Sequence, residues 1–530
     1  MRSWLRLFSS VAAMGLLVVA CAPVEDTEPA DTAAGDDEEE TTETEEEDTR
    51  EADPSATFRF GDPVGPSRFD PHLSTIGQDI RHFAPVYDRL VHLSPDGDPI
   101  PGLASSFEYS DDGLEFQMEL EQGVTFHDGE PFDAEAVAAN IERGQTLEGS
   151  SVAADLAVIE EVEVVDEHEV IFHLAEPNAM LPGMLSHRAG AMVSPGAFDN
   201  DDLDIMPVGA GMYEVTEHRP DDTIVYERYD DYWDEEVVGA DRFELQILPD
   251  DAARFNALRT GDVDLAFLTG RQVSEAEGAG LIVESDTALH YLVLYLNRSH
   301  EALEDPQVRQ AMNHAIDRDA IVESVLFGYG EASVQPFPEG YWAHNPDYPG
   351  DYYEFDPDRA RELLEEAGYG DGFEFEMLVT ALGTYEQTGE AVQNMLDEIG
   401  ITANITMVEP AQTADVYYAQ QDGDALTSQW GGRPDPSMTI ELQFTGEGFA
   451  NPGRHTTDEM GELHNEALTT IDFDERQEVI HRNVEHIVEQ AFQVPISHEH
   501  GVYGMTDEVV GFETLVTGQP NFRTLGLAPE

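Results

Sequence analysis

YLVLYL, at residues 291–296, and FQVPI, at residues 492–496, are the two apolar runs that decide how this chain folds. A short, continuous apolar run is typical of a strand that is buried on both faces. Residues 58–530 contain no low-complexity linker, so a boundary between domains must fall within strands. We therefore predict that each run is a buried strand crossing from one domain to another.

Outward from these runs, strand-like and helical patterns alternate. Residues 114–120 and 169–174 alternate apolar and polar side chains, as half-buried strands do. Helix starts are expected after four aspartates, whose carboxylates can accept hydrogen bonds from first-turn N–H groups: Asp133, Asp305, Asp356 and Asp474. The pattern predicts an α/β or α+β body without internal repeats.

The composition excludes several classes of protein. The chain has 530 residues, with Lys+Arg 25 against Asp+Glu 111 and a formal net charge of -86. Such a chain does not bind nucleic acid, because that affinity comes from cations that neutralise phosphates. All of its cations are arginines, which removes Schiff-base chemistry and any phosphate-loop lysine. A hydrophobic content of 41% still allows a large core.

The net charge also predicts the salt concentration in which the protein works. At molar salt the Debye length falls to about 3 Å, so dense surface carboxylates no longer repel one another over long range. We expect a halophilic, salt-adapted source. The alternative, an acidic exported protein from a GC-rich genome, explains the missing lysine but not the size of the charge.

The N-terminus has the pattern of an export signal. Arg2 and Arg6 precede an uncharged stretch at residues 7–20, which is shorter than the ~20 residues of a membrane span. Cys21, the only cysteine, follows directly. Residues 18–21, VVAC, resemble the lipobox of bacterial lipoproteins, which implies a signal peptide over residues 1–21 and lipid on Cys21. An ordinary secretory signal is the alternative.

Residues 22–57 are predicted to be a disordered tether. They hold 16 acidic residues and one basic residue, Arg50, with almost no aromatic side chains. Such a segment cannot bury enough apolar surface to fold. As a flexible chain it spans roughly 30 Å.

The order of motifs in residues 58–530 resembles the family 5 solute-binding proteins, the oligopeptide, dipeptide and nickel type that serves ABC importers. The motifs that carry the resemblance are FDPHLST at 69–75, PVYDRLV at 85–91, GLEFQMELEQGVTFHDGEPFDAEAV at 113–137, PVGAGMYEV at 207–215, DDYWDEE at 230–236, RFNALRTGDVDLAF at 254–267, DPQVRQAMNHAIDRDAIVESVLFGYG at 305–330, FDPDRARELLEEAGY at 355–369 and QWGGRPDP at 429–436. Each motif is weak alone, but their shared order is specific.

The resemblance implies a two-lobed, α/β periplasmic-binding-protein fold of type II, the Venus-flytrap type, with an extra subdomain in the larger lobe. Domain I would comprise residues 58–290 plus 497–530, and domain II residues 291–496. The two apolar runs then become hinge strands, which let the lobes close over a solute. A monomer is expected, held by its lipid on the extracytoplasmic (periplasmic or cell-surface) face, that delivers its ligand to membrane permease subunits.

The segment 430–436, WGGRPDP, is the most informative local stretch for the ligand. Its Gly and Pro residues fix a loop, Trp430 offers a stacking face, and Arg433 offers a bidentate cation. Peptide binders of the resembling family carry an aspartate at the position of Arg433, where it pairs with the peptide ammonium. An arginine there favours an anion or a group of hydroxyls. Peptides, oligosaccharides, opine-like compounds and metal chelates stay open, and so does simple pairing of Arg433 with Asp435.

Four aromatic residues are further candidates for the ligand cleft by position, with core packing as the alternative: Tyr87, Tyr109, Trp342 and Tyr385. His498, Glu499 and His500 on a strand, with His455 or His464, could resemble a metal site, but this spacing is not diagnostic and we expect no metal and no cofactor. No catalytic signature is present, so the chain is not expected to be an enzyme. The alternatives are a lipid-tethered surface hydrolase and a sensor without a transport partner.

Overall fold

The computed structural model describes residue 50, residues 52–234, residue 237 and residues 239–529. All of them belong to one compact unit, Asp48–Glu530. The expected signal peptide, Cys21 and most of the tether lie outside the described residues. Within the described part, no helix combines the length and the apolar character that a membrane span requires.

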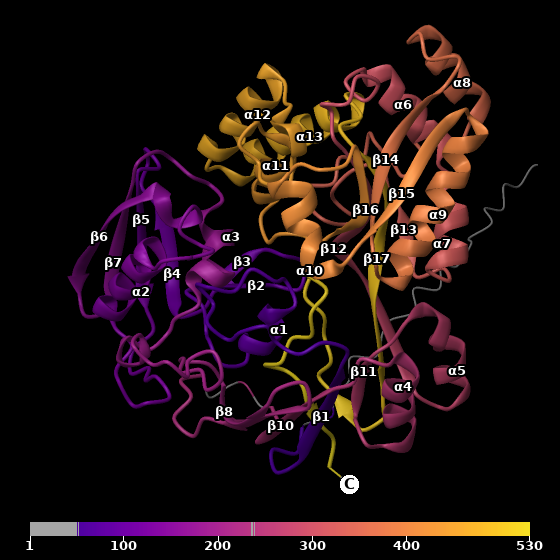
Figure 1. Ribbon diagram of the computed structural model, residues 1–530. Coiled ribbons are helices and arrows are strands. Elements are labelled where there is room, and N and C mark those ends of the chain that lie inside the picture. Colours follow the sequence, from indigo (N-terminus) through magenta and orange to yellow (C-terminus); the bar gives the residue numbers. More distant parts are fainter. Residues whose placement is uncertain (1–49, 51, 235–236, 238, 530) are drawn as a thin grey trace, which may run out of the picture. The chain divides into compact units, whose positions relative to one another are not determined.

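One 11-stranded sheet organises the unit (Figure 1). Along its main path the strand order is β15-β14-β16-β12-β17-β11-β1-β10-β9-β8, and β13 pairs with β17. The strands are β1 (Thr57–Asp62), β8 (Tyr213–Arg219), β9 (Thr223–Arg228), β10 (Arg242–Ile247), β11 (Leu265–Phe267), β12 (Ile282–Leu296), β13 (Gly330–Ala332), β14 (Phe373–Thr380), β15 (Ile401–Val408), β16 (Ala425–Trp430) and β17 (Val494–Met505).

The two longest strands, β12 and β17, run through the middle of this sheet as an antiparallel pair. The predicted buried strand at 291–296 is confirmed, because all six of its side chains are buried and pair with β16. The second run is only partly a strand, since β17 begins at Val494. Pairing between β12 and β17 is interrupted between Thr287 and Tyr291. The register break therefore divides β12 into two parts. The part after the break pairs with β16. The part before it pairs with residues of β17 that also pair with β11.

A separate sheet of four strands is formed by the first part of the chain and lies at the left of Figure 1. Its order is β4-β5-β7-β6, with β4 (Ala104–Tyr109), β5 (Glu115–Leu120), β6 (Ile159–Asp166) and β7 (Glu169–Leu174). The alternating patterns predicted for β5 and β7 are confirmed, since apolar residues such as Phe116 and Phe172 are buried in one cluster. Helix α2 (Ala134–Thr146) supplies further residues to that cluster.

The helices follow their capping signals. Asp133, Asp305 and Asp356 cap α2, α6 (Pro306–Ala315) and α8 (Pro357–Glu366), as predicted. The fourth prediction is wrong by two residues: α13 (Phe473–Glu489) is capped by Asp472, whose side chain accepts from Glu475 N. Asp474 lies in the first turn instead, where an acidic side chain is also favourable because of the helix dipole.

The remaining elements are α1 (Asp79–Phe83), α3 (Leu181–Leu185), α4 (Asp251–Thr260), α5 (Val273–Gly278), α7 (Arg318–Val325), α9 (Gly383–Glu398), α10 (Pro410–Thr413), α11 (Pro436–Phe444), α12 (Asp458–Thr469), β2 (Val91–Leu93), β3 (Pro99–Pro101), β18 (Val509–Val510) and β19 (Gly526–Leu527).

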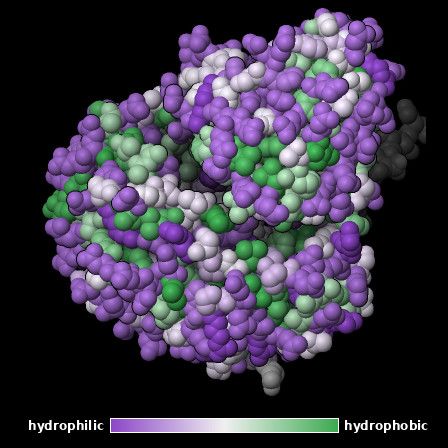
Figure 2. Space-filling view, viewed as in Figure 1, coloured by the Kyte–Doolittle hydropathy of each residue, from purple (hydrophilic) through white to green (hydrophobic). Residues whose placement is uncertain are grey.

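Backbone hydrogen bonds join the N-terminal end of the body to its C-terminal end and to the residue before β10. Asp53 N donates to Leu527 O at 2.7 Å, and Asp241 N donates to Pro54 O at 2.6 Å. The last residues of the expected tether are therefore attached to the body. Hydrophilic residues cover most of the face drawn in Figure 2, and that surface is hollowed between the regions that carry α3 and α11.

Candidate functional site

The loop between β16 and α11 carries Arg433 and is held from two sides. Gly432 has φ +65°, and a Cβ at this position would lie 2.6 Å from Leu289 Cβ, so only glycine fits. The Tyr341 hydroxyl donates to Pro434 O at 3.2 Å. The loop's Gly and Pro residues thus fix the direction in which Arg433 leaves the backbone.

Asp435 anchors this loop to helix α13. It caps α11 by accepting from Ser437 N, and its two carboxylate oxygens accept from Arg476 Nη1 and Nη2 at 2.8 and 2.7 Å. Both residues are buried. Asp435 was predicted to contact the ligand, but the structure places it in a bidentate ion pair that leaves it little capacity for a solute.

Arg433 lies on the ring of Trp430. Its guanidinium carbon is 4.7 Å from the ring centroid, and its Nη1 donates to the neighbouring Gly432 O at 2.6 Å. Trp430 is 7% exposed and donates to Thr439 Oγ1 through its indole N–H. The alternative pairing of Arg433 with Asp435 is not formed, because Asp435 binds Arg476. The described residues give Arg433 no carboxylate partner.

The opposite side of the site comes from the first part of the chain. Arg188 begins a short 3-10 helix, Arg188–Gly190, and is held by hydrogen bonds to Ser74 Oγ and Ile76 O. His187 precedes it. Asp155 begins another 3-10 helix, Asp155–Val158. We call these four residues, Arg433, Arg188, His187 and Asp155, the cationic cluster, after the two guanidinium groups that it contains.

The members of the cationic cluster act on one another electrostatically. Burial, followed by the charge of Arg433, lowers the pKa of Arg188 to about 10. Burial, followed by Arg188 and Arg433, lowers the pKa of His187 well below its usual value, so this imidazole is neutral at pH 7. Burial lowers the pKa of Arg433 as well, although Asp155 opposes that change. The charges of Arg433 and Arg188 therefore act on each other and on the neutral His187.

Asp155 is the carboxylate that acts on both arginines. Burial raises its pKa, against the attraction of Arg433 and Arg188. Neither arginine forms an ion pair with it within 4.0 Å among the described residues. Other buried arginines are better satisfied: Arg309 and Arg318 each donate to several backbone carbonyl oxygens. The cationic cluster thus has donors to spare, which an anionic or hydroxyl-rich group could accept.

The segments carrying the two arginines also touch directly. Ala179 N donates to Leu468 O at 2.7 Å, and a Cβ at Gly183 would lie 2.7 Å from Asp435 Cβ. Gly183 belongs to α3, and Asp435 caps α11. Helix α3 therefore packs against the N-terminus of α11.

The other predicted aromatic residues lie at different places. Tyr87 is fully buried in a core cluster, so a solute cannot reach it in this conformation. Tyr109 donates to Asn178 O at 2.5 Å; burial raises its pKa, while the charge of Arg476 lowers it and that of Asp435 raises it. Trp342 packs beneath Arg476, at 5.7 Å from the guanidinium carbon to the ring centroid. Only Tyr109 and Trp342 are therefore close to the anchored loop.

Tyr385 is near Glu499 of β17. The charge of Glu499 contributes to raising the pKa of Tyr385, after burial. Burial also raises the pKa of Glu499 to about 7, although a hydrogen bond from Gln429 lowers it. His498 is buried beside Tyr291. Among the described residues no group of three or more His, Cys, Asp or Glu side chains could hold a metal ion.

The sequence did not single out Arg188, His187 or Asp155, because they are distant from WGGRPDP along the chain. One signal in the sequence could have found Arg188. In a chain with so few cations, an arginine without an acidic residue close to it in the sequence is a candidate for binding an anionic ligand.

The comparisons with known proteins decide the family. The model of the bacterial extracellular solute-binding proteins, family 5, matches residues 98–451. The chain belongs to this family. The expected periplasmic-binding-protein fold is confirmed as well: NikA from Brucella suis in complex with Fe(III)-EDTA is similar to this family 5 protein with a TM-score of 0.80 and 25% identity, over 89% of this chain and 100% of that one.

Two further proteins are similar to this family 5 protein in structure or in sequence. AgaA from A. tumefaciens R10, solved with agropinic acid, has a TM-score of 0.78 and 25% identity over 90% of this chain and 99% of its own. The glutathione-binding protein GsiB of Salmonella paratyphi A is 31% identical over 334 residues, 62% of this chain and 65% of that protein. The chain thus aligns with just under two thirds of the length of this relative.

Proposed function

We propose that this family 5 protein is the substrate-binding component of an ABC importer, and that it captures a solute through an anionic group held between Arg433 and Arg188. The observation that carries the proposal is that the charges of these two arginines act on each other, while neither has an ion-pair partner among the described residues, in a chain where acids outnumber cations 111 to 25. A hydrogen bond from a charged donor contributes about 1.5–3 kcal/mol.

The charges also couple binding to closure. We propose that the lobes are residues 58–290 plus 497–530 and residues 291–496, which places Arg188 and Arg433 on opposite lobes. The register break in β12 at Thr287–Tyr291 is then the hinge. Bringing the lobes together brings two like charges together, which is unfavourable in a desolvated site. An anion between them reverses the sign of this interaction, so the ligand selects the closed form.

The solutes of the relatives are compatible with this proposal. AgaA was solved with agropinic acid and NikA with Fe(III)-EDTA, and GsiB is named for glutathione. All three solutes carry carboxylate groups. For this chain we therefore favour a small solute with at least one carboxylate, such as an opine-like acid, a chelate or a peptide bound through its carboxylate.

Transport is tested directly in proteoliposomes that contain the cognate permease and ATPase subunits. We expect uptake of the carboxylate solute, and ATP hydrolysis by the ATPase, to depend on this chain, and the solute to be recovered unchanged. Chemical conversion of the solute by the purified chain would favour the surface hydrolase instead. Tight binding without any stimulation of uptake would favour a sensor.

We further propose that Cys21 carries the lipid that keeps the protein on the extracytoplasmic face. Two or more acyl chains hold a protein on a bilayer far better than one. Mass spectrometry of the mature N-terminal peptide tests this: a lipid-modified Cys21 supports the anchor. An unmodified N-terminus beyond residue 21, or a Cys21→Ser variant that still fractionates with membranes, contradicts it.

A further inference from the structure

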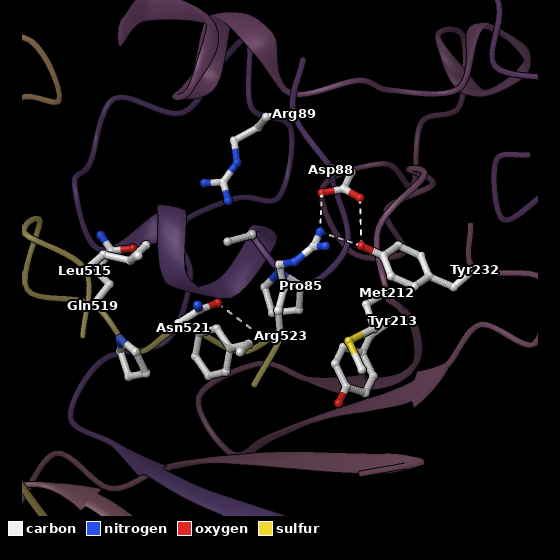
Figure 3. A pocket seen from close by; sticks show the side chains of 13 residues that line it. Pro85, Asp88, Arg89, Met212, Tyr213, Tyr232, Leu515, Gln519, Asn521 and Arg523 are labelled. Carbon is white, nitrogen blue, oxygen red and sulfur yellow. Dashed lines mark hydrogen bonds and ion pairs between the residues drawn. The ribbon is translucent and has the colours of Figure 1, made fainter. Parts of the chain in front are cut away.

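Arg89 points into a small, partly open cavity, and none of the described residues offers its guanidinium an acceptor (Figure 3). The cavity has a volume of about 40 Å³. It is lined by Ala84, Pro85, Asp88 and Arg89, by Met212, Tyr213 and Tyr232, and by the C-terminal segment Leu515 and 519–523. The Nε atom of Arg89 is buried and lacks a partner, and no hydrogen bond or ion pair reaches its side chain from the described residues.

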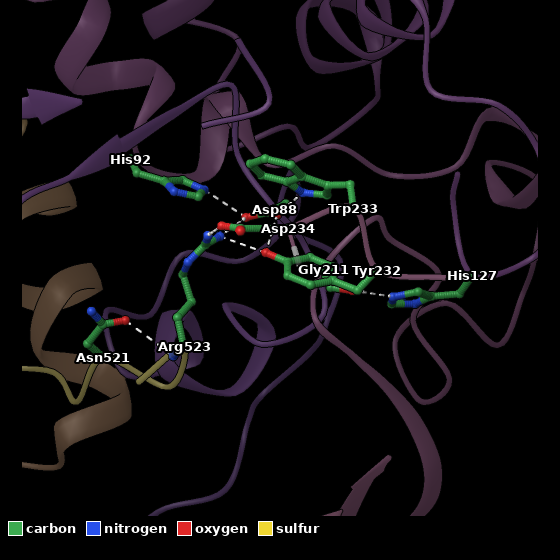
Figure 4. Close-up of polar contacts among 9 residues, drawn as sticks. All are labelled: Asp88, His92, His127, Gly211, Tyr232, Trp233, Asp234, Asn521 and Arg523. Carbon is green, nitrogen blue, oxygen red and sulfur yellow. Dashed lines mark hydrogen bonds and ion pairs between the residues drawn. The ribbon is translucent and has the colours of Figure 1, made fainter. Parts of the chain in front are cut away.

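The neighbouring carboxylate cannot serve Arg89, because other donors already occupy it (Figure 4). Asp88 Oδ1 accepts from His92 at 2.7 Å and from Arg523 at 3.5 Å. Its Oδ2 accepts from the Tyr232 hydroxyl at 2.9 Å and the Trp233 indole at 2.8 Å. Burial raises the pKa of Asp88, but His92, Arg523 and Trp233 outweigh it and hold the carboxyl ionised. Its acceptor positions are thus filled.

The charges around the cavity favour an anion. Arg89 and Arg523 both line it, whereas Asp88 is the only acidic residue that does so among the described residues. Arg523 is already paired with Asp88 and Asp234. Arg89 therefore has no counter-charge of its own among the described residues, and its buried Nε lacks an acceptor, which costs free energy unless one enters the cavity.

The size of the cavity selects the kind of acceptor. A water needs about 10–15 Å³ of such volume, so the cavity has room for a monatomic ion or for a few waters. Pockets for solutes of drug-like size are about 300–1,000 Å³. The transported solute is therefore too large for this cavity.

We propose that this cavity is a binding site for a small monovalent anion, chloride in a salt medium, with Arg89 as its principal ligand. The anion would tie the C-terminal segment 515–523 to the 84–89 segment, because both line the cavity. It would also neutralise Arg89, whose charge acts on His187 in the cationic cluster. The proposal does not depend on the transport function.

Bromide is the probe for the site. We expect crystals of the mature protein grown in sodium bromide to show an anomalous difference peak in this cavity, in contact with the Arg89 guanidinium. Density for waters only, without an anomalous peak, would overturn the proposal, and so would a peak that stays in place in Arg89→Gln crystals.

A solution measurement separates specific binding from screening. The melting temperature is compared in sodium chloride and in sodium isethionate, a larger anion, at the same ionic strength. We expect chloride to raise the melting temperature of the wild type by about 2 °C or more over isethionate, because the ion binds only the folded state. The difference should vanish in Arg89→Gln and persist in Arg259→Gln, which removes an exposed arginine. Equal melting temperatures of the wild type in both salts would contradict the proposal.

Discussion

The guanidinium carbon of Arg433 lies 4.7 Å from the centre of the Trp430 ring, so the protein itself occupies a face of this tryptophan. Trp430 is also 7% exposed and belongs to a core cluster. Its ring was predicted to offer the ligand a stacking face. The geometry favours support: the ring positions Arg433, and Arg433 faces the site.

Trp430→Ala is therefore expected to act first on stability. Truncation of a buried tryptophan costs about 3–5 kcal/mol. Trp430→Phe keeps a ring beneath Arg433, so it should retain most of the affinity for the ligand while losing the hydrogen bond to Thr439. Denaturant unfolding and calorimetry distinguish the two effects. If Trp430→Phe loses as much affinity as Arg433→Ala while staying folded, the indole contacts the ligand directly.

The Asp435–Arg476 ion pair is expected to hold the loop that carries Arg433. Removing one partner leaves a buried charge without compensation, which typically costs about 3–5 kcal/mol. Asp435→Ala should therefore lower the free energy of unfolding strongly, whereas Asp474→Ala, at an exposed first-turn position, should change it little. Unfolding curves in urea provide the measurement. A small loss for Asp435→Ala would show that the loop is fixed by other contacts.

Glu499 is expected to make stability depend on pH. Its folded pKa is raised from 4.5 to about 7 by burial, so between these values the folded state binds more protons than the unfolded state. The contribution of Glu499 to the free energy of unfolding is complete below about pH 4.5. It is lost as the pH rises through 7, which lowers the free energy of unfolding by up to about 3 kcal/mol. Glu499→Gln should abolish this loss. We expect the free energy of unfolding of the variant, relative to wild type, to rise between pH 5 and pH 8; a constant difference contradicts the shift.

Salt is expected to stabilise the whole body. The formal net charge of the whole chain is -86, and the excess acids of its folded body raise the free energy of the compact state at low ionic strength, a repulsion that counterions screen. The melting temperature should climb steeply between low salt and molar NaCl. A flat response would indicate that the acids are locally compensated, and the salt-adapted interpretation would lose its support.

The sequence predicted the fold better than the site. Helix caps such as Asp133 and the buried strand at 291–296 are local signals, because neighbouring residues determine them. Arg433 was found because its motif is local too. Arg188 and Asp155 were not found, since only the packing of distant segments brings them toward Arg433. Tyr87 was proposed for the cleft but lies in the core. The sequence does not distinguish these two positions, because they too depend on how distant segments pack.

The central claim is that an anionic group of the solute binds between Arg433 and Arg188. Calorimetry with a carboxylate solute and its amide tests it on wild type, Arg433→Ala, Arg188→Ala and the double variant, with Arg259→Ala as the control. We expect each single variant to lose about tenfold to a hundredfold in affinity for the carboxylate, a non-additive loss in the double variant, and weak binding of the amide throughout. Equal affinity for carboxylate and amide, unchanged by Arg433→Ala, would contradict the account.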